Sequence, residues 1–307
     1  MSGATSAVRA APGATVLVRE VAVPTWPFRL GGGSRDGLLR RRGDGLVRLV
    51  HAPEPAVVAV AQRGPRVVFA ARALSEAAAR AGIARVRFAT GVDDDLAEFY
   101  ERFRDDPVIG RAVRAHPELR VRRHPTRFEA LMWAVTEQLI DGERATEIQK
   151  ALIARLGRRW AGLRDSPSAA VVAAQAPARL EACGLAGKRA LALRRAARVD
   201  LDMPDWRARL LAIPEIGTWT VEVVELHGRG ELGVIPAGDL GYLKLVGRLL
   251  TGHPKAVADE AEVRGFFSAY APWAGLAGEY LRLTGPRRLP VPQGTRSSAA
   301  ATRRAAA

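Results

Sequence analysis

Apolar and polar positions near the start of the chain alternate as they do in β-strands. The segment ATVLVREVAV at 14–23 alternates apolar and polar side chains, while LVRLV at 46–50 and AVVAVAQ at 56–62 are short β-branched runs. The segment QRGPRVVFAA predicts a hairpin that turns at Gly64 and Pro65. These patterns predict a small domain built on an antiparallel sheet.

Helical spacing then replaces the alternation. A short helix is expected from a Ser75 N-cap to a stop at Gly82, and from about residue 93 onward the whole pattern is helical. In HPTRFEALMWAVTEQLI, Thr126 is a predicted N-cap, and the next segment ends at Gly157. Within HPTRFEALMWAVTEQLI, apolar side chains recur at helical spacing, at Phe128, Leu131, Met132, Val135 and Leu139. Short periodic segments separated by brief breaks continue to about residue 285.

The predicted fold class is therefore α+β, with a small N-terminal α/β domain followed by an all-α domain. We expect the α/β domain at 14–92 and the helical domain at 93–285. The flanking stretches 1–13 and 286–307 lack periodicity, and the second is rich in Pro, Ala and Arg, so both are expected to be disordered. A chain of 307 residues is long enough for two domains.

Charge and cysteine content narrow the range of functions. The formal net charge of +15 is either a codon-usage effect in an Arg- and Ala-rich chain or a surface that meets a polyanion such as nucleic acid. Cys183 is the only cysteine, which excludes disulfides and four-cysteine metal sites and suits a reduced cytosol. No signal-peptide core or run of about 20 apolar residues is present, so we expect a cytoplasmic, nucleoid-associated protein without a membrane partner.

A tight turn between two predicted helices stands out in LLAIPEIGTWTVEVV. Pro214 ends the first helix, and Gly217 is expected to adopt a positive φ just before the second. The first amides of the second helix would then point outward without partners, a geometry that suits a phosphate oxygen. The alternative is an ordinary corner between two helices, which the turn taken alone favours.

Four segments in order resemble the helix–hairpin–helix (HhH-GPD) DNA glycosylase superfamily, and most closely its AlkA-like 3-methyladenine DNA glycosylase II group. They are FEALMWAVTEQLIDGERATEIQKALIARLG, GLAGKRALALRRAARV, the hairpin IPEIGTWTVEVV and the segment GVIPAGDLGYLK. The resemblance spans roughly Ala14 to Gly285. It departs from the family at Glu215, where a Gly is usual and where a carboxylate would repel a phosphate.

The resemblance implies a role for each part of the hairpin segment. The residues expected to meet a DNA phosphate are Pro214, Glu215, Ile216, Gly217, Thr218 and Thr220. Family hairpins often bind Na⁺ or K⁺ through backbone carbonyls, here those of Leu211, Ile213 and Ile216. No other cofactor is expected. Asp239 falls at the position of the catalytic carboxylate, although an Asp before LGYLKLV is also a good helix N-cap.

The same resemblance implies a pocket for a flipped base and a wedge that replaces it in the stack. Trp219 would be an aromatic wall for the base, or else a core residue at a helix start. Two further aromatic positions of the family fall near Val223 and Arg282, with Trp273 and Tyr280 nearby, which predicts a less aromatic pocket. Gln138 and Leu139 lie at the wedge position, and Leu139 could instead end a core stripe.

The expected reaction is hydrolysis rather than strand cleavage. Lyases of the superfamily carry a Schiff-base Lys at the second position after the last Gly of the hairpin, where this chain has Trp219. The resemblance therefore implies a monomeric, monofunctional glycosylase that removes alkylated bases from double-stranded DNA. A damage-binding module without turnover is the alternative, and an oxidised-purine glycosylase is disfavoured by the missing Lys.

Overall fold

The computed structural model describes residues 15–284, so the ends predicted to be disordered, 1–13 and 286–307, lie outside the described residues. The described chain divides into two compact units. The first comprises 15–96 and 118–231, and the second comprises 97–117 and 232–284. The domain limits expected from the sequence, 14–92 and 93–285, remain predictions.

The first unit contains a five-stranded antiparallel sheet with the order β1-β5-β4-β3-β2. Its strands are β1 (Val16–Ala22), β2 (Arg40–Arg42), β3 (Gly45–His51), β4 (Pro55–Arg63) and β5 (Arg66–Ala73). The turn between β4 and β5 lies at Gly64 and Pro65, as expected. The predicted antiparallel sheet near the N-terminus is confirmed.

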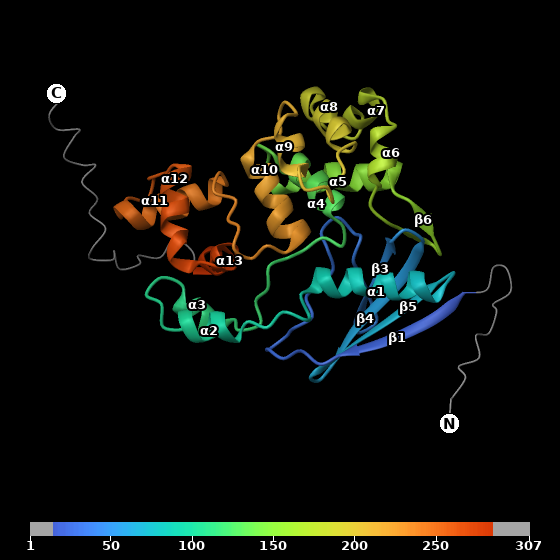
Figure 1. The fold of residues 1–307 in the computed structure, drawn as a ribbon, viewed down its shortest axis with the longest axis horizontal. Coiled ribbons are helices and arrows are strands. Elements are labelled where there is room, and N and C mark those ends of the chain that lie inside the picture. The colour runs from blue at the N-terminus through green and yellow to red at the C-terminus, as the bar shows by residue number, and fades with distance from the viewer. Residues whose placement is uncertain (1–14, 285–307) are drawn as a thin grey trace. The chain divides into compact units, whose positions relative to one another are not determined.

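Helix α1 (Glu76–Thr90) covers one face of this sheet (Figure 1). Ser75 caps it, as expected, but the expected stop at Gly82 is wrong, because the helix continues to a left-handed Gly91. A Cβ on Gly82 would lie 2.7 Å from the Ala56 side chain. The glycine therefore lets the helix approach the sheet closely and does not end it.

The remainder of the first unit is helical apart from one short hairpin. Its helices are α4 (Arg127–Glu137), α5 (Gly142–Leu156), α6 (Ala169–Ala173), α7 (Pro177–Glu181), α8 (Gly187–Ala196), α9 (Trp206–Leu211), α10 (Thr218–Val223) and the π-helix η1 (Val224–Arg229). Strands β6 (Arg159–Trp160) and β7 (Leu163–Arg164) form a two-stranded hairpin that helical spacing does not predict. Thr126 caps α4 and Gly157 follows α5, both as expected.

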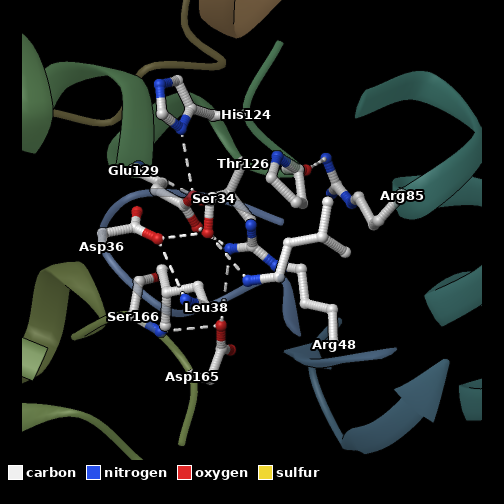
Figure 2. Close-up of polar contacts among 12 residues, drawn as sticks. Ser34, Asp36, Leu38, Arg48, Arg85, His124, Thr126, Glu129, Asp165 and Ser166 are labelled. Carbon is white, nitrogen blue, oxygen red and sulfur yellow. Dashed lines mark hydrogen bonds and ion pairs between the residues drawn. The ribbon is translucent and has the colours of Figure 1, made fainter. Parts of the chain in front are cut away.

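A buried ionic network fastens the sheet to the helices of the first unit (Figure 2). Arg48 of β3 reaches Glu129 of α4 at 2.5 Å and lies 3.9 Å from Asp165. The other Glu129 oxygen lies 3.0 Å from His124 Nδ1. Burial by itself would raise the pKa of Glu129, but Arg48 and His124 outweigh it and lower that pKa to about 2.

The regular elements in the described residues of the second unit are all helices. Its elements are α2 (Ala97–Phe103), α3 (Gly110–Ala115), α11 (Leu240–Thr251), α12 (Glu260–Phe267), the 3-10 helix η2 (Ser268–Tyr270) and α13 (Ala274–Thr284). Rings from four of these elements and the α13 lead-in pack together at its centre, namely Phe99, Phe103, Phe267, Tyr270, Trp273 and Tyr280. No helix among residues 15–284 has the length and apolar character needed to cross a membrane.

Candidate active site

The turn between α9 and α10 is a hairpin held from inside the first unit. Ile216 is buried in the helical core, and its amide donates to the Ile213 carbonyl at 3.0 Å. The expectation of a positive φ at Gly217 is wrong. Gly217 has φ −104°, and Glu215 has φ +72° instead. Position 215 therefore has a backbone that favours Gly, which fits the family's usual residue there.

The N-terminal amides of α10 have no capping side chain. Gly217 occupies the N-cap position without a side chain to accept from them. Thr218 next to it is exposed, as is the Glu215 side chain. Amides at a helix start attract anions, and the expected phosphate contact at this hairpin stays a prediction.

Gln138 ties this hairpin to the end of α4. Its side-chain nitrogen donates to the Glu215 carbonyl at 2.9 Å and to the Thr220 hydroxyl at 2.8 Å. Thr220 is buried, so its hydroxyl supports the hairpin from within. The Gln138 amide is thus engaged with protein groups, and of the predicted wedge pair only Leu139 has a free side chain.

Leu139 is the most exposed of the large apolar residues in the described chain, with 97% of its surface accessible. It also adopts φ +53°, a left-handed conformation that costs a non-glycine residue of the order of 1 kcal/mol. The core interpretation of Leu139 is therefore wrong. A strained backbone and a fully exposed side chain are what is expected of a leucine that inserts into a ligand and not into the protein core.

Trp219 and Val223 both lie on α10. Val223 is buried, whereas the Trp219 ring is half-buried. Trp133 and Trp206 show what a core tryptophan looks like in this unit, since both are almost fully buried. Trp219 differs from them and retains a surface that a ligand can contact.

Asp239 lies in the second unit, at the N-cap of α11. Its Oδ1 accepts from the Gly241 amide at 2.8 Å and lies 3.0 Å from Arg282 Nη2. No hydrogen bond or ion pair from residues 15–284 reaches Oδ2. The side chain is 24% exposed. Asp239 is therefore fixed through one oxygen and open at the other.

Two neighbours make this arrangement of Asp239 specific. A Cβ on Gly241 would lie 2.8 Å from Oδ1, so a larger residue there would force the Asp239 carboxylate to shift. Arg282 lies over the Tyr242 ring at 4.2 Å and 3.8 Å from Glu279. Burial would lower the pKa of Arg282, but Tyr242 and Asp239 outweigh it and raise that pKa. Sequence reasoning missed Arg282 as a partner; its only signal was a lone arginine in the apolar segment LAGEYLRL.

Trp273 and Tyr280 come together, but around Phe99. The Tyr280 ring stacks on Phe99 with centroids 5.3 Å apart, and its hydroxyl donates to the His116 carbonyl at 2.9 Å. Trp273 packs edge-on against Phe99 and Phe103. Tyr280 is only 1% exposed, and this packing indicates a structural role. Their predicted place in the base pocket stays a prediction.

The expected monovalent-cation site depends on carbonyls of the hairpin. The Ile213 carbonyl accepts from the Ile216 amide, and a carbonyl keeps a second lone pair for a ligand. No cluster of three or more His, Cys, Asp or Glu side chains suited to a metal occurs in the described range 15–284. The monovalent-cation site at the hairpin carbonyls therefore stays a prediction.

Comparison with known proteins shows which proteins this chain is similar to. No established family profile matches the chain. The chain is 30% identical over 268 residues, 81% of its length, to the probable bifunctional transcriptional activator/DNA repair enzyme AlkA of Mycobacterium tuberculosis. The match covers 51% of that protein, so the chain spans about half the length of the curated relatives it matches.

Solved structures share the fold. The 3-methyladenine DNA glycosylase of Archaeoglobus fulgidus superposes with a TM-score of 0.70 at 20% identity, over 80% of this chain and 88% of that one. The apo 8-oxoguanine glycosylase/lyase of Clostridium acetobutylicum gives 0.65 at 16% identity, over 86% of this chain and 95% of that one. The resemblance of this chain to the helix–hairpin–helix DNA glycosylase superfamily is thereby confirmed.

Proposed function

We propose that this chain is a monofunctional DNA glycosylase that hydrolyses the N-glycosidic bond of an alkylated base flipped out of duplex DNA. The observation that carries the proposal is Asp239, which is held rigidly through Oδ1 while Oδ2 has no partner in the described chain. The products are the free base and an intact abasic site, with water as the nucleophile.

The chemistry needs little more than one well-placed carboxylate. As the glycosidic bond breaks, positive charge develops on the sugar, and a preorganised anion in a partly dry site stabilises it. An alkylated purine such as 3-methyladenine is already cationic and leaves readily. Asp239 Oδ2 would face the sugar cation or orient the attacking water, while Oδ1 stays on Gly241 and Arg282.

The first unit would supply the binding groups. The free amides after Gly217 would receive a backbone phosphate, and Leu139 would fill the gap that the flipped base leaves in the stack. Trp219 would stack on the electron-poor alkylated base. A Na⁺ or K⁺ ion on the carbonyls of Leu211, Ile213 and Ile216 would stabilise the hairpin, and we propose no other cofactor.

Monofunctional chemistry is supported by the absence of an amine at the hairpin. Trp219 stands where lyases carry Lys, and Lys244, near Asp239 in sequence, is exposed on α11. A Schiff-base Lys must be desolvated to be nucleophilic at neutral pH. Because the fold is shared with a glycosylase/lyase, borohydride trapping is the direct test, and we expect no covalent protein–DNA adduct.

A second candidate is a monomeric protein that binds damaged DNA without turnover. The Arg282–Asp239 contact favours it, since a cation 3.0 Å from the carboxylate weakens the field at the sugar. Glu215 in the hairpin also favours it, because an exposed carboxylate there weakens phosphate binding.

The deciding experiment incubates the chain with alkylated genomic DNA and identifies the released bases by mass spectrometry. We expect free 3-methyladenine and an equal number of abasic sites under single-turnover conditions. Tight binding of the alkylated DNA without any released base would establish the binding module instead. Neither binding nor release would overturn both candidates.

A further inference from the structure

The N-terminal sheet domain carries an arginine-bearing turn that none of the proposed steps uses. We call Ser34–Arg40 the arginine loop. The Ser34 amide donates to the Leu39 carbonyl at 2.9 Å, and the Leu39 amide donates back to the Ser34 hydroxyl at 2.9 Å. Gly37 takes φ +81°, where a side chain would be strained. The loop is thus a defined turn with closed hydrogen bonds.

Buried residues of the first unit anchor this loop. Leu38 is buried among the residues of the helical core cluster, although it belongs to the strand-rich segment. Asp36 accepts from the Ser34 hydroxyl and from the Leu38 amide. Figure 2 shows Asp36 and Ser34 next to the buried Arg48–Glu129 pair. The loop is therefore anchored to the same network that joins the sheet to α4.

The anchored loop places Arg35 next to the start of α5, which follows the wedge residue closely in sequence. Arg35 is exposed, and its Nη1 lies 3.8 Å from the position that a Cβ on Gly142 would occupy. Gly142 begins α5, three residues after Leu139. Arg40 ends the loop, and its Nε donates to the Gly37 carbonyl at 2.7 Å. Arg35 is thus the guanidinium group of this loop that reaches the start of α5.

The position of Arg35 is not explained by an acidic partner within the described chain. Asp141 caps α5, and its Oδ1 accepts from the amides of Glu143 and Arg144. Those backbone bonds and Arg144, and not Arg35, hold the pKa of Asp141 below its usual range. Arg35 forms no ion pair with any residue of the described range 15–284. An exposed, unpaired guanidinium on a rigid loop is suited to an external phosphate.

We propose that the arginine loop is a second DNA-binding surface, which binds backbone phosphates next to the point where Leu139 enters the duplex. The inference rests on the proposed function for the position of the wedge. It extends the DNA footprint from the hairpin to the N-terminal domain. Contacts of this kind position the protein on DNA without reading base sequence.

The test compares binding of Arg35→Ala, Arg35→Lys and wild type to a labelled duplex that contains a stable abasic-site analogue, by fluorescence anisotropy across salt concentrations. The slope of log K against log salt is negative, and loss of one phosphate contact makes it shallower by about 0.9. We expect that change for Arg35→Ala and a near-normal slope for Arg35→Lys. The matched control is Arg19→Ala, an exposed arginine on β1 of the same sheet, which should leave the slope unchanged.

A scan with neutral methylphosphonates locates the contact. In wild type, neutralising one particular phosphate should weaken binding, and in Arg35→Ala the same substitution should have no further effect. Equal slopes for Arg35→Ala and wild type, or an Arg19→Ala slope that falls equally, would overturn the inference while leaving the proposed function intact. If the wild-type chain binds no duplex at all, the proposed function itself fails. Unchanged thermal unfolding of Arg35→Ala confirms that only the surface was altered.

Discussion

Glu129 and Asp239 are both carboxylates beside an arginine, and they differ in how many oxygens are engaged. Glu129 is 1% exposed, with one oxygen on Arg48 and the other on His124. Asp239 is 24% exposed, with both of its contacts on Oδ1 and none in the described chain on Oδ2. A carboxylate with both oxygens engaged stabilises the fold, whereas one with a free oxygen retains capacity for a substrate.

The largest expected effect is on stability, from Glu129→Gln. Removing the charge leaves Arg48 buried without its main partner, and breaking such a pair costs about 3–5 kcal/mol of unfolding free energy. Chemical denaturation of the purified variant measures the loss. Base release per folded molecule should stay close to wild type, and a variant that is stable but inactive would show that Glu129 also serves catalysis.

The same residue makes stability depend on pH in a defined range. The pKa of Glu129 is about 2 in the folded chain and near 4.5 when unfolded. Because the folded value is depressed, the contribution is complete above about pH 4.5 and is lost as pH falls towards 2. Denaturation midpoints should fall less steeply over that range in Glu129→Gln than in wild type.

Asp239→Asn should reduce base release and leave stability close to wild type, the reverse of Glu129→Gln. It keeps the shape of the side chain and much of its capping ability but removes the charge that faces the sugar. We expect base release to fall at least about a hundredfold, which corresponds to about 2.7 kcal/mol of lost transition-state stabilisation, with little change in unfolding or duplex binding. Single-turnover release assays measure it. Activity above about a tenth of wild type would remove Asp239 from the catalytic role.

A smaller effect is expected from Arg282, which positions Asp239 through Oδ1. Arg282→Met removes the contact and lets the carboxylate rotate, so we expect a loss of about tenfold in the single-turnover rate, or about 1.4 kcal/mol, with unchanged DNA affinity. Arg282→Lys restores a cation and should recover part of the rate. A faster Arg282→Met enzyme would show that the arginine acts mainly by damping the negative charge.

The sequence predicts the local elements well where one residue determines them. Ser75, Thr126 and Asp239 are N-caps in the structure because a short polar side chain before an apolar run has one good use. The expectations for Gly82 and Gly217 are wrong because a glycine can permit close packing or adopt an ordinary backbone conformation as well as a positive φ. The spacing around each glycine does not distinguish these uses.

Contacts between distant segments are what the sequence could not predict. Arg48 and Glu129 are 81 positions apart, and Gln138 reaches a carbonyl 77 positions away. No period or motif links such pairs, because burial selects them only after the helices and the sheet have packed. The wedge position followed from resemblance, but the exposure of Leu139 and the role of Gln138 required the structure.

The smallest expected effect concerns Glu215, whose side-chain carboxylate makes no hydrogen bond or ion pair within residues 15–284, although its backbone carbonyl accepts from Gln138. It combines a backbone that favours glycine, at φ +72°, with a negative charge in the hairpin proposed to meet a phosphate. Glu215→Gly relieves the backbone and removes the charge, whereas Glu215→Gln removes the charge alone. We expect both variants to bind duplex DNA a few-fold more tightly, since a repulsive charge near a phosphate is gone.

The two variants separate charge from backbone. Relief of the left-handed strain in Glu215→Gly is opposed by the greater freedom of glycine in the unfolded chain, so its stability should stay close to wild type. If only Glu215→Gly tightens binding, the backbone and not the carboxylate limits DNA affinity. If neither variant changes affinity at low salt, where charge effects are largest, Glu215 faces solvent in the complex and the hairpin tolerates it.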